Sequence, residues 1–383
     1  MAALPVPRPL LCRGQVCMDI FSIHHIAGRF NAIALVDIAP RSDVLPELPT
    51  TTFLHAGPPL AGAVPQAMRR ATLFAILYEG LAGDAAQACH MLDSGAVTLR
   101  PAQDFGVVTP LAQVVSASAP LAVVQGANGR RFAPLIEAGV PALRFGNPPD
   151  DAAARLRMME LFGLQVLRPA LARQPVALAP LVLAALQQGE ECHALTSAAN
   201  ARLVESLSLP ARDRALLAAY PAFVLPILMA ASSAWLQESA SPISAVGGNG
   251  LQFGWRGRGE TAWRTVDAVP PAGVSMEGMQ TREALGAIGD SAVIDFAGLG
   301  GQALAFSPAL AQTYASFLPQ DLRAHRAAVL DARTGNASPE AIAASGQSAL
   351  VNLAILGAPA CSGLIGRGVY AAPPSLFTPA RRQ

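Results

Sequence analysis

Glycines recur through the stretch from Val246 to Ala309, and they restrict its fold more than any other feature of the chain. They cluster at Gly247-Gly248-Asn249-Gly250, at Ile288-Gly289-Asp290-Ser291 and at Gly298-Leu299-Gly300-Gly301. Glycine adopts positive φ angles and lets two backbones approach closely, so long regular helices are disfavoured here and tight turns are favoured. Backbone N–H groups exposed in such turns, with oriented Asn, Asp and Ser side chains between them, are suited to binding a small anion.

The same spacing is also typical of tight turns that only connect elements of an α/β domain, and spacing alone slightly favours that interpretation. No glycine run matches the spacing of a P-loop or of a dinucleotide-binding fingerprint. The glycines therefore indicate a candidate anion site without identifying its ligand.

Length and composition predict a multi-domain chain with partners. The chain has 383 residues, of which 52% are hydrophobic and only 14% are charged. So much apolar surface must be buried inside the protein or against other subunits, and we expect a homo- or hetero-oligomer. The formal net charge is only +1, and no basic cluster is interleaved with aromatic residues, so nucleic-acid binding is not expected.

The chain contains no lysine, and all 27 of its Lys and Arg positions are therefore arginines. This excludes Schiff-base chemistry, a Walker lysine and a lysine general base. Any anion would be held by arginine and by backbone amides, a geometry suited to carboxylates and phosphates. A codon bias toward Ala and Arg would equally explain the absence.

The five cysteines are scattered, and none forms a C-x-x-C pair, so the sequence predicts no metal site, no cofactor and a reducing cytoplasm. The N-terminus lacks the uninterrupted apolar region of a secretory signal. The apolar segment Ala215–Leu236 is long enough to span a bilayer, but Pro221 and Pro226 interrupt it. We expect a buried helix pair there and no membrane span.

The order of patterns predicts an α+β fold with three parts. An N-terminal α/β portion covers residues 1–149, a helical domain covers 150–240, and a C-terminal glycine-rich α/β portion covers 241–383. Expected strands are Ala32–Val36, Thr50–Leu54, Val107–Val108, Gln113–Ala117, Leu121–Val124, Pro141–Asn147 and Ala349–Ile355. Expected helices are Val64–Leu81, Ala85–Leu92, most of Ala152–Leu236, Pro308–Leu330 and Ser338–Ser345.

The run Gly189-Glu190-Glu191-Cys192-His193 places two carboxylates, a thiol and an imidazole together. Only Glu190 and His193 have the i, i+3 spacing that shares a helix face, and two ligands are too few for a metal site. A structural hydrogen-bonding role is the favoured interpretation for Glu190, whereas His193 remains a candidate for substrate contact.

Six motifs occur in one order along the chain, and together they carry a family resemblance. They are Leu54-His55-Ala56-Gly57-Pro58-Pro59, Tyr78-Glu79-Gly80-Leu81-Ala82, Leu143-Arg144-Phe145-Gly146, Gly189–His193, Asn249-Gly250 with Phe253-Gly254, and Ile288–Ala292 with Gly298–Gly301. From about Val36 to Pro373 the chain resembles the AllG (YlbE-like) subunit family of the catabolic oxamate carbamoyltransferase.

The resemblance implies a function and partners. It implies transfer of a carbamoyl group between oxalurate and phosphate, giving oxamate and carbamoyl phosphate in purine and allantoin nitrogen catabolism. It also implies FdrA-like and AllH-like partner subunits, a small anionic substrate and phosphate. Such chemistry needs anion cradles and donors for a developing oxyanion, which arginine, asparagine and backbone N–H groups can supply.

The chain departs from the family pattern at several polar positions. Ala194-Leu195-Thr196 stands where Asn-Arg-Asn is expected, and Asn352-Leu353-Ala354 stands in place of Asn-Thr-Gly. Arg100–Asp104 replaces a Cys-His-His run, and Gly248 replaces an arginine. These losses indicate a divergent substrate or lost activity, so an assembly subunit without its own catalysis stands beside the carbamoyltransferase interpretation.

The candidate site combines residues from five of these six motifs. Asn249, His55 and Asp290 are the candidate catalytic residues, with Asn249 as the oxyanion donor and Arg144 as the carboxylate clamp. The candidate substrate-binding residues are Arg144, Gly57, Gly146, His193, Gly248, Gly250, Gly254, Ser291, Gly300 and Gly301.

Overall fold

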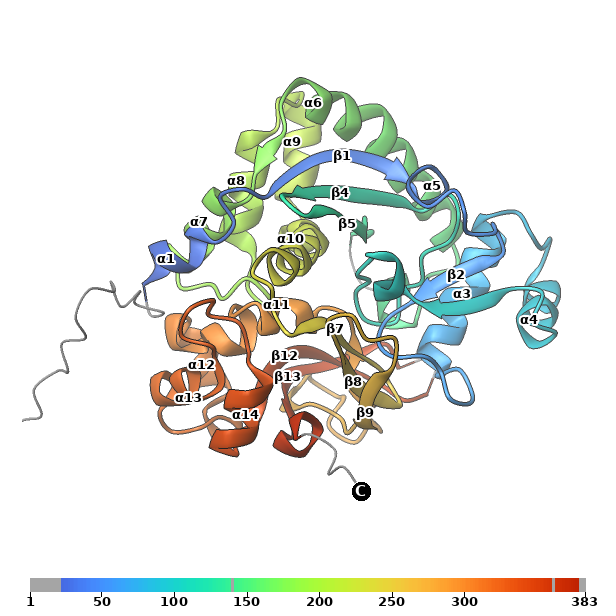
Figure 1. Cartoon of the computed structure of the whole chain (residues 1–383). Coiled ribbons are helices and arrows are strands. Elements are labelled where there is room, and N and C mark those ends of the chain that lie inside the picture. The colour runs from blue at the N-terminus through green and yellow to red at the C-terminus, as the bar shows by residue number, and fades with distance from the viewer. Residues whose placement is uncertain (1–21, 139–140, 360–361, 379–383) are drawn as a thin grey trace, which may run out of the picture.

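The computed structural model describes residues 22–138, 141–359 and 362–378 (Figure 1). In these ranges helices and sheets alternate without forming one continuous sheet, which confirms the predicted α+β class.

The N-terminal part is built on an antiparallel sheet with strand order β5-β4-β1-β6. A separate parallel pair, β2 with β3, lies beside the helices α3 and α4. The elements are α1 (Ile23–Gly28), β1 (Ala34–Pro40), α2 (Arg41–Val44), β2 (Thr52–His55), α3 (Gln66–Tyr78), α4 (Ala85–Asp93), β3 (Thr98–Pro101), β4 (Pro120–Gly126) and β5 (Gly129–Pro134).

Helices dominate the middle of the chain, apart from the short strand β6 (Val176–Ala177), which pairs with β1. The helices are α5 (Ala152–Phe162), α6 (Arg168–Arg173), α7 (Ala179–Gln187), α8 (Ser197–Ser206), α9 (Ala211–Ala218) and α10 (Leu225–Glu238).

The C-terminal part holds two further sheets, with strand orders β11-β7-β8-β9 and β10-β13-β12. Its strands are β7 (Ile243–Asn249), β8 (Gln252–Gly257), β9 (Trp263–Asp267), β10 (Ala272–Ser275), β11 (Ile288–Gly289), β12 (Ala349–Leu356) and β13 (Leu364–Ala372). Its helices are α11 (Ala292–Phe296), α12 (Pro308–Thr313), α13 (Leu322–Val329) and α14 (Pro339–Ser345).

Helix α10 lies between the N-terminal sheet and the C-terminal elements (Figure 1). It contacts β4 and β5 on one side and α11 and β7 on the other. Its residues from Pro226 to Ser232 are all buried, so the apolar character of this segment reflects its central position in the core.

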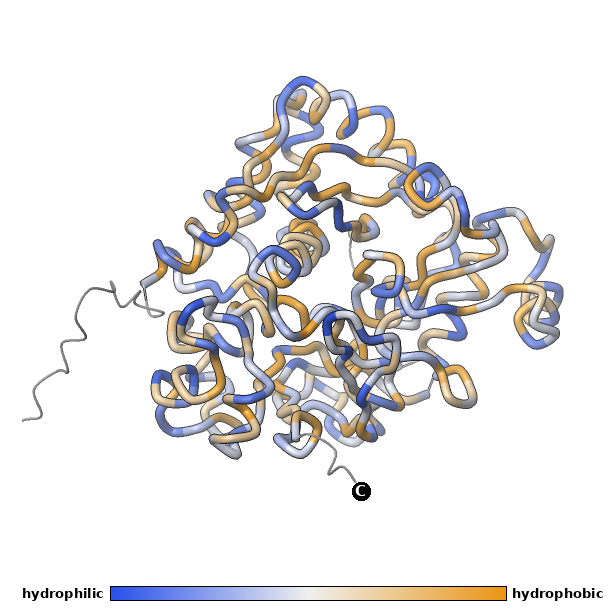
Figure 2. The backbone as a smooth tube through the Cα atoms, viewed as in Figure 1, coloured by the Kyte–Doolittle hydropathy of each residue, from blue (hydrophilic) through white to orange (hydrophobic). Residues whose placement is uncertain are grey.

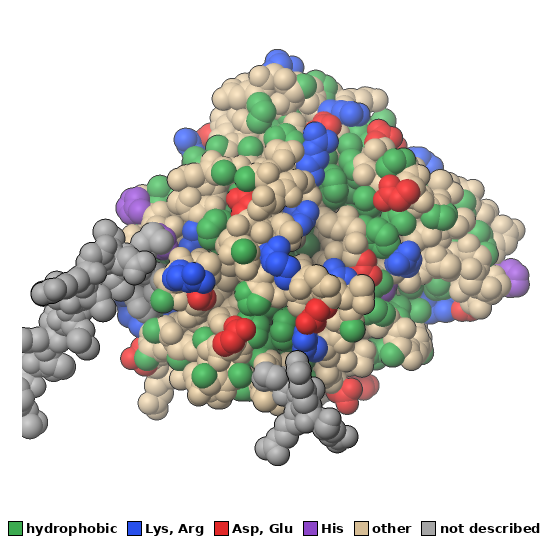
Figure 3. All heavy atoms as spheres, in the orientation of Figure 1, with side chains coloured by type: hydrophobic (Ala, Val, Ile, Leu, Met, Phe, Trp, Pro, Cys, Tyr) green, Lys and Arg blue, Asp and Glu red, His purple; other side chains and the backbone are tan. Residues whose placement is uncertain are grey.

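The core is shared by all parts of the chain. Buried side chains of β1, α10, β7 and β12 belong to one contiguous cluster, represented by Ile38, Ile227, Val246 and Val351. In Figure 2 hydrophobic residues run along β1, while many outer turns are hydrophilic. On the face shown in Figure 3, side chains of both charges are interspersed with apolar ones. The division of the chain into three domains, with boundaries after residues 149 and 240, stays a prediction.

Among the described residues, no single helix is long and apolar enough to cross a bilayer. One bent helix pair, 211–218 with 221–238, meets the length and composition criteria together, with an angle of 88° between its parts.

Three predicted strands are wrong. Around Arg144 the chain forms a single 3-10 turn, Leu143–Phe145, because Gly146 adopts a left-handed φ of 70° that breaks an extended path. Residues 107–108 and 113–117 contribute only isolated bridges, from Val107 to Phe132 and from Val115 to Leu54. The turn between them contains Leu111 at a φ of 48°, which interrupts a regular strand.

Candidate functional site

A glycine junction joins the loop after β2 to the end of β7. Gly57 has a φ of 78°, and a Cβ at this position would overlap the backbone of Gly248 and Asn249. The glycines here therefore permit two chain segments to touch. We use the term glycine junction for Gly57, Gln103, Thr109, Gly248, Asn249 and Asp290.

Asp290 is the hydrogen-bonding centre of the glycine junction. Its Oδ1 accepts hydrogen bonds from the Gly57 N–H at 2.8 Å and from Gln103 Nε2 at 2.6 Å, and its Oδ2 accepts from the Thr109 N–H at 3.0 Å. Complete burial raises the pKa of Asp290 to about 7, although these three hydrogen bonds favour the charged form. This side chain connects three segments that are distant in the sequence.

The side chain of Asn249 is also occupied by backbone partners. Its Oδ1 accepts from the N–H groups of Leu251 at 3.0 Å and Gln252 at 2.8 Å, and its Nδ2 donates to Pro58 O at 3.0 Å. Asn249 is buried and shapes the turn from β7 into β8. Its oxyanion role stays a prediction.

His55 lies buried at the end of β2. Its Nδ1 donates to the carbonyl of Ala56 at 2.8 Å, while Nε2 is buried without a hydrogen-bond partner among the described residues. Burial lowers the pKa of His55 to about 4, so the ring is neutral near pH 7.

A cavity of about 660 Å³ lies apart from these side chains, at the meeting of the helical segment with β12, β13 and the turn that holds Arg144. Its lining residues are Pro110, Leu111, Ala138, Arg144, Phe145, His193, Ala194, Leu195, Thr196, Ser197, Ala219, Tyr220, Pro221, Ala222, Leu225, Ser291, Asn352, Leu353, Ala354, Leu364 and Arg367. We call this space the central cavity.

His193 and Asp295 form a buried pair at the wall of the central cavity. His193 Nδ1 lies 2.9 Å from Asp295 Oδ2, and Asp295 Oδ1 accepts from the N–H groups of Gly301 at 2.5 Å and Asn352 at 3.0 Å. Burial lowers the pKa of His193, but the carboxylate of Asp295 raises it, and the net shift is upward. The fixed Nδ1 leaves Nε2 as the ring nitrogen available for proton transfer.

Glu191 fixes the loop that carries His193. Its carboxylate accepts from the N–H groups of Ala194 at 2.5 Å and Leu195 at 3.0 Å, and from Asn352 Nδ2 at 2.9 Å. Burial raises the pKa of Glu191 above its ordinary value. The loop before α8 is thereby tied to β12, and both line the same cavity.

Arg144 presents a guanidinium on another wall. It is only 6% exposed, its NH1 donates to Glu137 O at 2.7 Å, and its Cζ lies 4.3 Å from the Phe145 ring centroid and 5.5 Å from that of Tyr220. The stacked rings hold the planar group in place while it faces the cavity.

Three buried polar atoms in the cavity lining have no hydrogen-bond partner among the described residues. They are Ser291 Oγ, Asn352 Oδ1 and Tyr220 Oη. Buried polar groups are rarely unpaired, so three around one space point to a polar ligand. Arg367 adds an exposed cation to the lining and forms no ion pair with a described carboxylate.

The central cavity thus brings together three predicted residues, Arg144, His193 and Ser291. Gly300 and Gly301 support it, because a Cβ on Gly300 would overlap Asp295 and the Gly301 N–H binds that carboxylate. The remaining predicted residues, namely His55, Gly57, Gly146, Gly248, Asn249, Gly250, Gly254 and Asp290, do not line it.

Sequence reasoning missed Asp295, Tyr220 and Arg367 and did not propose Asn352 as a site residue. Asp295 follows the Asp290-Ser291 motif by one helical turn, which was a usable signal. The other three carry no local motif, and only tertiary packing reveals them.

Glu190 Oε2 accepts the N–H of Ala198 at 2.8 Å near the start of α8, which confirms its predicted structural role. No group of three potential metal ligands occurs among residues 22–138, 141–359 and 362–378.

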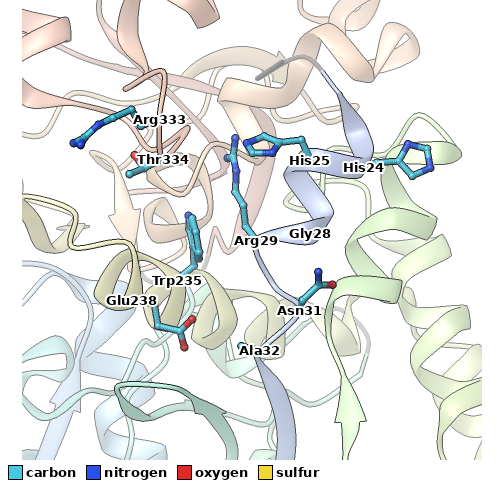
Figure 4. A pocket seen from close by; sticks show the side chains of 10 residues that line it. All are labelled: His24, His25, Gly28, Arg29, Asn31, Ala32, Trp235, Glu238, Arg333 and Thr334. Carbon is cyan, nitrogen blue, oxygen red and sulfur yellow. The ribbon is translucent and has the colours of Figure 1, made fainter. Parts of the chain in front are cut away.

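A second pocket of about 500 Å³ lies where α1, the end of α10 and the loop at Arg333 meet (Figure 4). Its buried cation, Arg29, donates to the carbonyls of Ala297 at 3.5 Å and Gly335 at 3.2 Å. These bonds join the N-terminal helix to the C-terminal part, and a Cβ on Gly335 would overlap the Arg29 guanidinium. Arg29 therefore connects distant segments here.

Comparisons with known proteins identify related chains. A family model described as "Oxamate carbamoyltransferase subunit AllG" matches residues 97–291. The oxamate carbamoyltransferase subunit AllG of Escherichia coli K12 is 31% identical over 297 residues, which cover 71% of this chain and 71% of that protein. The uncharacterized protein YahG of the same organism is 29% identical over 290 residues, covering 70% of this chain and 61% of YahG.

A crystal structure also shares the fold. A conserved protein of unknown function from Enterococcus faecalis V583 superposes with a TM-score of 0.78 and 24% identity, covering 92% of this chain and 94% of the other.

Proposed function

Because the chain belongs to the AllG family of oxamate carbamoyltransferase subunits, we propose that its central cavity is the carbamoyl-transfer site of a multi-subunit enzyme. The proposed reaction converts oxalurate, or a related ureido acid, and phosphate into oxamate, or its analogue, and carbamoyl phosphate. The observation that carries the proposal is the convergence of Arg144, the His193–Asp295 pair and three unpaired buried polar atoms on one cavity.

Two arginines suit the two anions of this reaction. Arg144 is held rigidly by two aromatic rings, and its guanidinium matches the planar carboxylate of a ureido acid. Arg367 lies at an exposed part of the lining and is the group we assign to phosphate, which enters from solvent.

The carbamoyl group itself would be held by the unpaired polar atoms. Ser291 Oγ can donate to the carbamoyl oxygen as negative charge develops there, and Asn352 Oδ1 can accept from the carbamoyl NH₂. Burial raises the pKa of Tyr220 to about 12, so its hydroxyl stays protonated and can donate to the substrate.

His193 is assigned the proton transfer. A phosphate oxygen attacks the carbamoyl carbon, and the bond from that carbon to the amide nitrogen breaks. Imidazolium Nε2 protonates the leaving nitrogen, and the ring regains a proton from the hydroxyl of hydrogen phosphate, so protons and charge balance. Asp295 fixes the tautomer through Nδ1, and the raised pKa of His193 favours the protonated ring at the start.

The glycine junction is assigned a positioning role. Asp290 precedes Ser291 and binds the Thr109 N–H, while Pro110 and Leu111 follow Thr109 and line the cavity. Asn249 and Gly57 hold the neighbouring loop in place. We therefore place Asn249, His55 and Asp290 beside the chemistry and not in contact with the reacting atoms.

We further propose that the protein acts in purine or allantoin nitrogen catabolism in the cytoplasm, in a complex with FdrA-like and AllH-like subunits. The high apolar content and membership in a family of enzyme subunits support an assembly. The chain can be purified alone and with both neighbours, and its mass measured by light scattering. A well-behaved monomer that ignores both partners would contradict the assembly.

An assembly subunit without its own catalysis is the second candidate function. It is favoured by the hydrogen bonds of Asn249 and Asp290, which serve the fold of the chain. The deciding experiment measures carbamoyl phosphate formation from oxalurate and phosphate by the reconstituted complex. We expect His193→Gln in this chain to abolish most turnover without dissociating the complex. Full activity of that variant complex would support the assembly role instead.

A further inference from the structure

The lining of the central cavity combines buried polar groups with more exposed side chains that are mostly apolar. Its buried lining residues include His193, Arg144, Ser291 and Asn352, which carry the groups assigned to the reaction. Nine of the twelve partly or fully exposed lining residues are apolar, namely Ala138, Ala194, Leu195, Ala219, Pro221, Ala222, Leu225, Ala354 and Leu364, and the other three are Ser197, Tyr220 and Arg367. Arg367 is the charged residue among the exposed part of this described lining.

These apolar residues form the more exposed part of the lining and therefore border the opening of the cavity. The Thr196 hydroxyl donates to Pro221 O at 2.9 Å, so the loop bearing Leu195 adjoins the segment that leads to Leu225. Ala354 of β12 pairs with Arg367 of β13, which places the apolar wall beside the exposed cation. A ligand that reaches Arg144 and His193 through this opening would pass these apolar side chains.

Oxalurate alone does not account for such a lining. It is a small ureido acid without any hydrocarbon group, whereas a cavity of about 660 Å³ lies in the range of roughly 300–1,000 Å³ that holds drug-sized ligands. Apolar side chains around a binding site are stabilised when an apolar group of the ligand covers them.

We propose that the substrate is a ureido acid bearing a branched alkyl or aryl group. Its carboxylate and ureido groups face Arg144 and His193, and its hydrocarbon group lies against Leu195 and Leu225. This inference rests on the proposed function of the central cavity and narrows its substrate class.

A pair of ligands that differ only in the hydrocarbon group tests the proposal. N-carbamoyl-glycine and N-carbamoyl-leucine are titrated calorimetrically into the full chain and into its complex with the partner subunits. Since each buried methylene contributes about 0.8 kcal/mol, we expect the leucine compound to bind at least about tenfold more tightly. Equal dissociation constants, or no binding of either compound to chain and complex, would overturn the proposal.

Two variants of the cavity lining test which side chains produce the preference for the leucine compound. Leu195→Asn and Leu225→Asn should each reduce the preference for the leucine compound over the glycine compound by about tenfold or more. Leu216→Asn makes the same change at an exposed position of α9 outside the cavity lining, and it should keep the full preference. Folding of all three is checked by thermal unfolding. Retained preference in both folded cavity variants would overturn the assignment.

Turnover measured in parallel separates the two proposals. Equal binding of both compounds together with rapid carbamoyl phosphate formation from oxalurate would overturn the apolar substrate and leave the function standing. Tighter binding of N-carbamoyl-leucine without phosphate-dependent cleavage of any ureido acid would show a preference for an apolar ligand, but it would overturn the carbamoyl-transfer function and with it the role of that ligand as substrate. If a partner subunit covers the opening instead, the preference should vanish in the complex, which also overturns the proposal.

Discussion

The glycine junction and the central cavity use similar polar residues in opposite ways. In the junction, the side chains of Asn249 and Asp290 form hydrogen bonds with backbone groups of neighbouring loops. In the cavity, Ser291 and Asn352 each retain a buried oxygen without a described partner. Adjacent residues, Asp290 and Ser291, thus belong to different environments. Residue type alone therefore does not separate a binding group from a structural one, and the hydrogen-bond partners of each side chain must be considered as well.

The largest expected effect belongs to the junction. Gly57→Ala introduces a Cβ that would overlap the Gly248 backbone and also imposes a positive φ on alanine. Overpacking and backbone strain each cost about 1–3 kcal/mol, so we expect a loss of roughly 2–6 kcal/mol in urea unfolding. Gly80→Ala is the control, because Gly80 has a φ of 68° with open space around it and should show strain alone. Equal losses at both positions would mean that the close contact is unimportant.

The largest effect on activity should come from the cavity. His193→Gln removes proton transfer and should lower kcat for carbamoyl phosphate formation by about 10²–10⁴-fold with little change in KM. His90→Gln, on the exposed side of α4, is the matched control and should keep full activity. Unchanged kcat in a folded His193 variant would remove this residue from the mechanism.

Local patterns in the sequence predicted much of the fold. The helix expected from Ala85 extends to Asp93 and is capped by Asp84, and the strand expected from Ala349 extends to Leu356. These elements have strong periodicity and clear boundary residues, which act over a few positions. Arg144 shows the limit, because Gly146 bends the chain and a short apolar run could not reveal that turn.

The site was predictable only in part, because its pairings are tertiary. His193 and Asp295 are 102 residues apart, and Asn352 Nδ2 reaches Glu191 across 161 residues. The positions where the sequence departs from its family's polar pattern indicate part of the cavity lining. Ala194, Leu195, Leu353 and Ala354 all line the central cavity, so these departures change the lining of the proposed binding site and leave the fold intact.

Asn249→Ala tests whether Asn249, which the sequence predicts to bind the oxyanion, has a structural role in the glycine junction or a catalytic one. Loss of its Oδ1 leaves the N–H groups of Leu251 and Gln252 without their acceptor, which should cost about 1–3 kcal/mol in urea unfolding. Turnover per folded molecule should stay nearly unchanged. An intact stability with a 10²–10³-fold lower kcat would instead assign Asn249 to the oxyanion and reverse the comparison.

Arg144→Lys tests whether the cavity recognises a carboxylate by geometry. Lysine keeps the charge but loses the two parallel hydrogen bonds of a guanidinium and its stacking on Phe145. We expect KM for the ureido acid to rise about tenfold while kcat falls little. Arg212→Lys on the surface of α9 serves as the control. An unchanged KM in the Arg144 variant would show that this cation does not clamp the substrate.

The smallest effect expected is a pH dependence of stability that originates in the junction. Burial raises the pKa of Asp290 from 3.8 to about 7, so the folded state binds a proton more tightly than the unfolded state. The stability that this group contributes is fully present below its unfolded pKa and is lost as pH rises through about 7. Between pH 6 and 8 this loss of stability amounts to roughly 1 kcal/mol. The upward shifts of Glu191 and His193 act in the same direction, so the Asp290 part must be isolated. Asp290→Asn removes the titration, and we expect a lower but flatter stability curve in urea unfolding, because the amide NH₂ cannot accept the hydrogen bonds that the second carboxylate oxygen takes. The same slope in wild type and Asp290→Asn would place the pH sensitivity in the His193 cluster and leave the junction pH-independent.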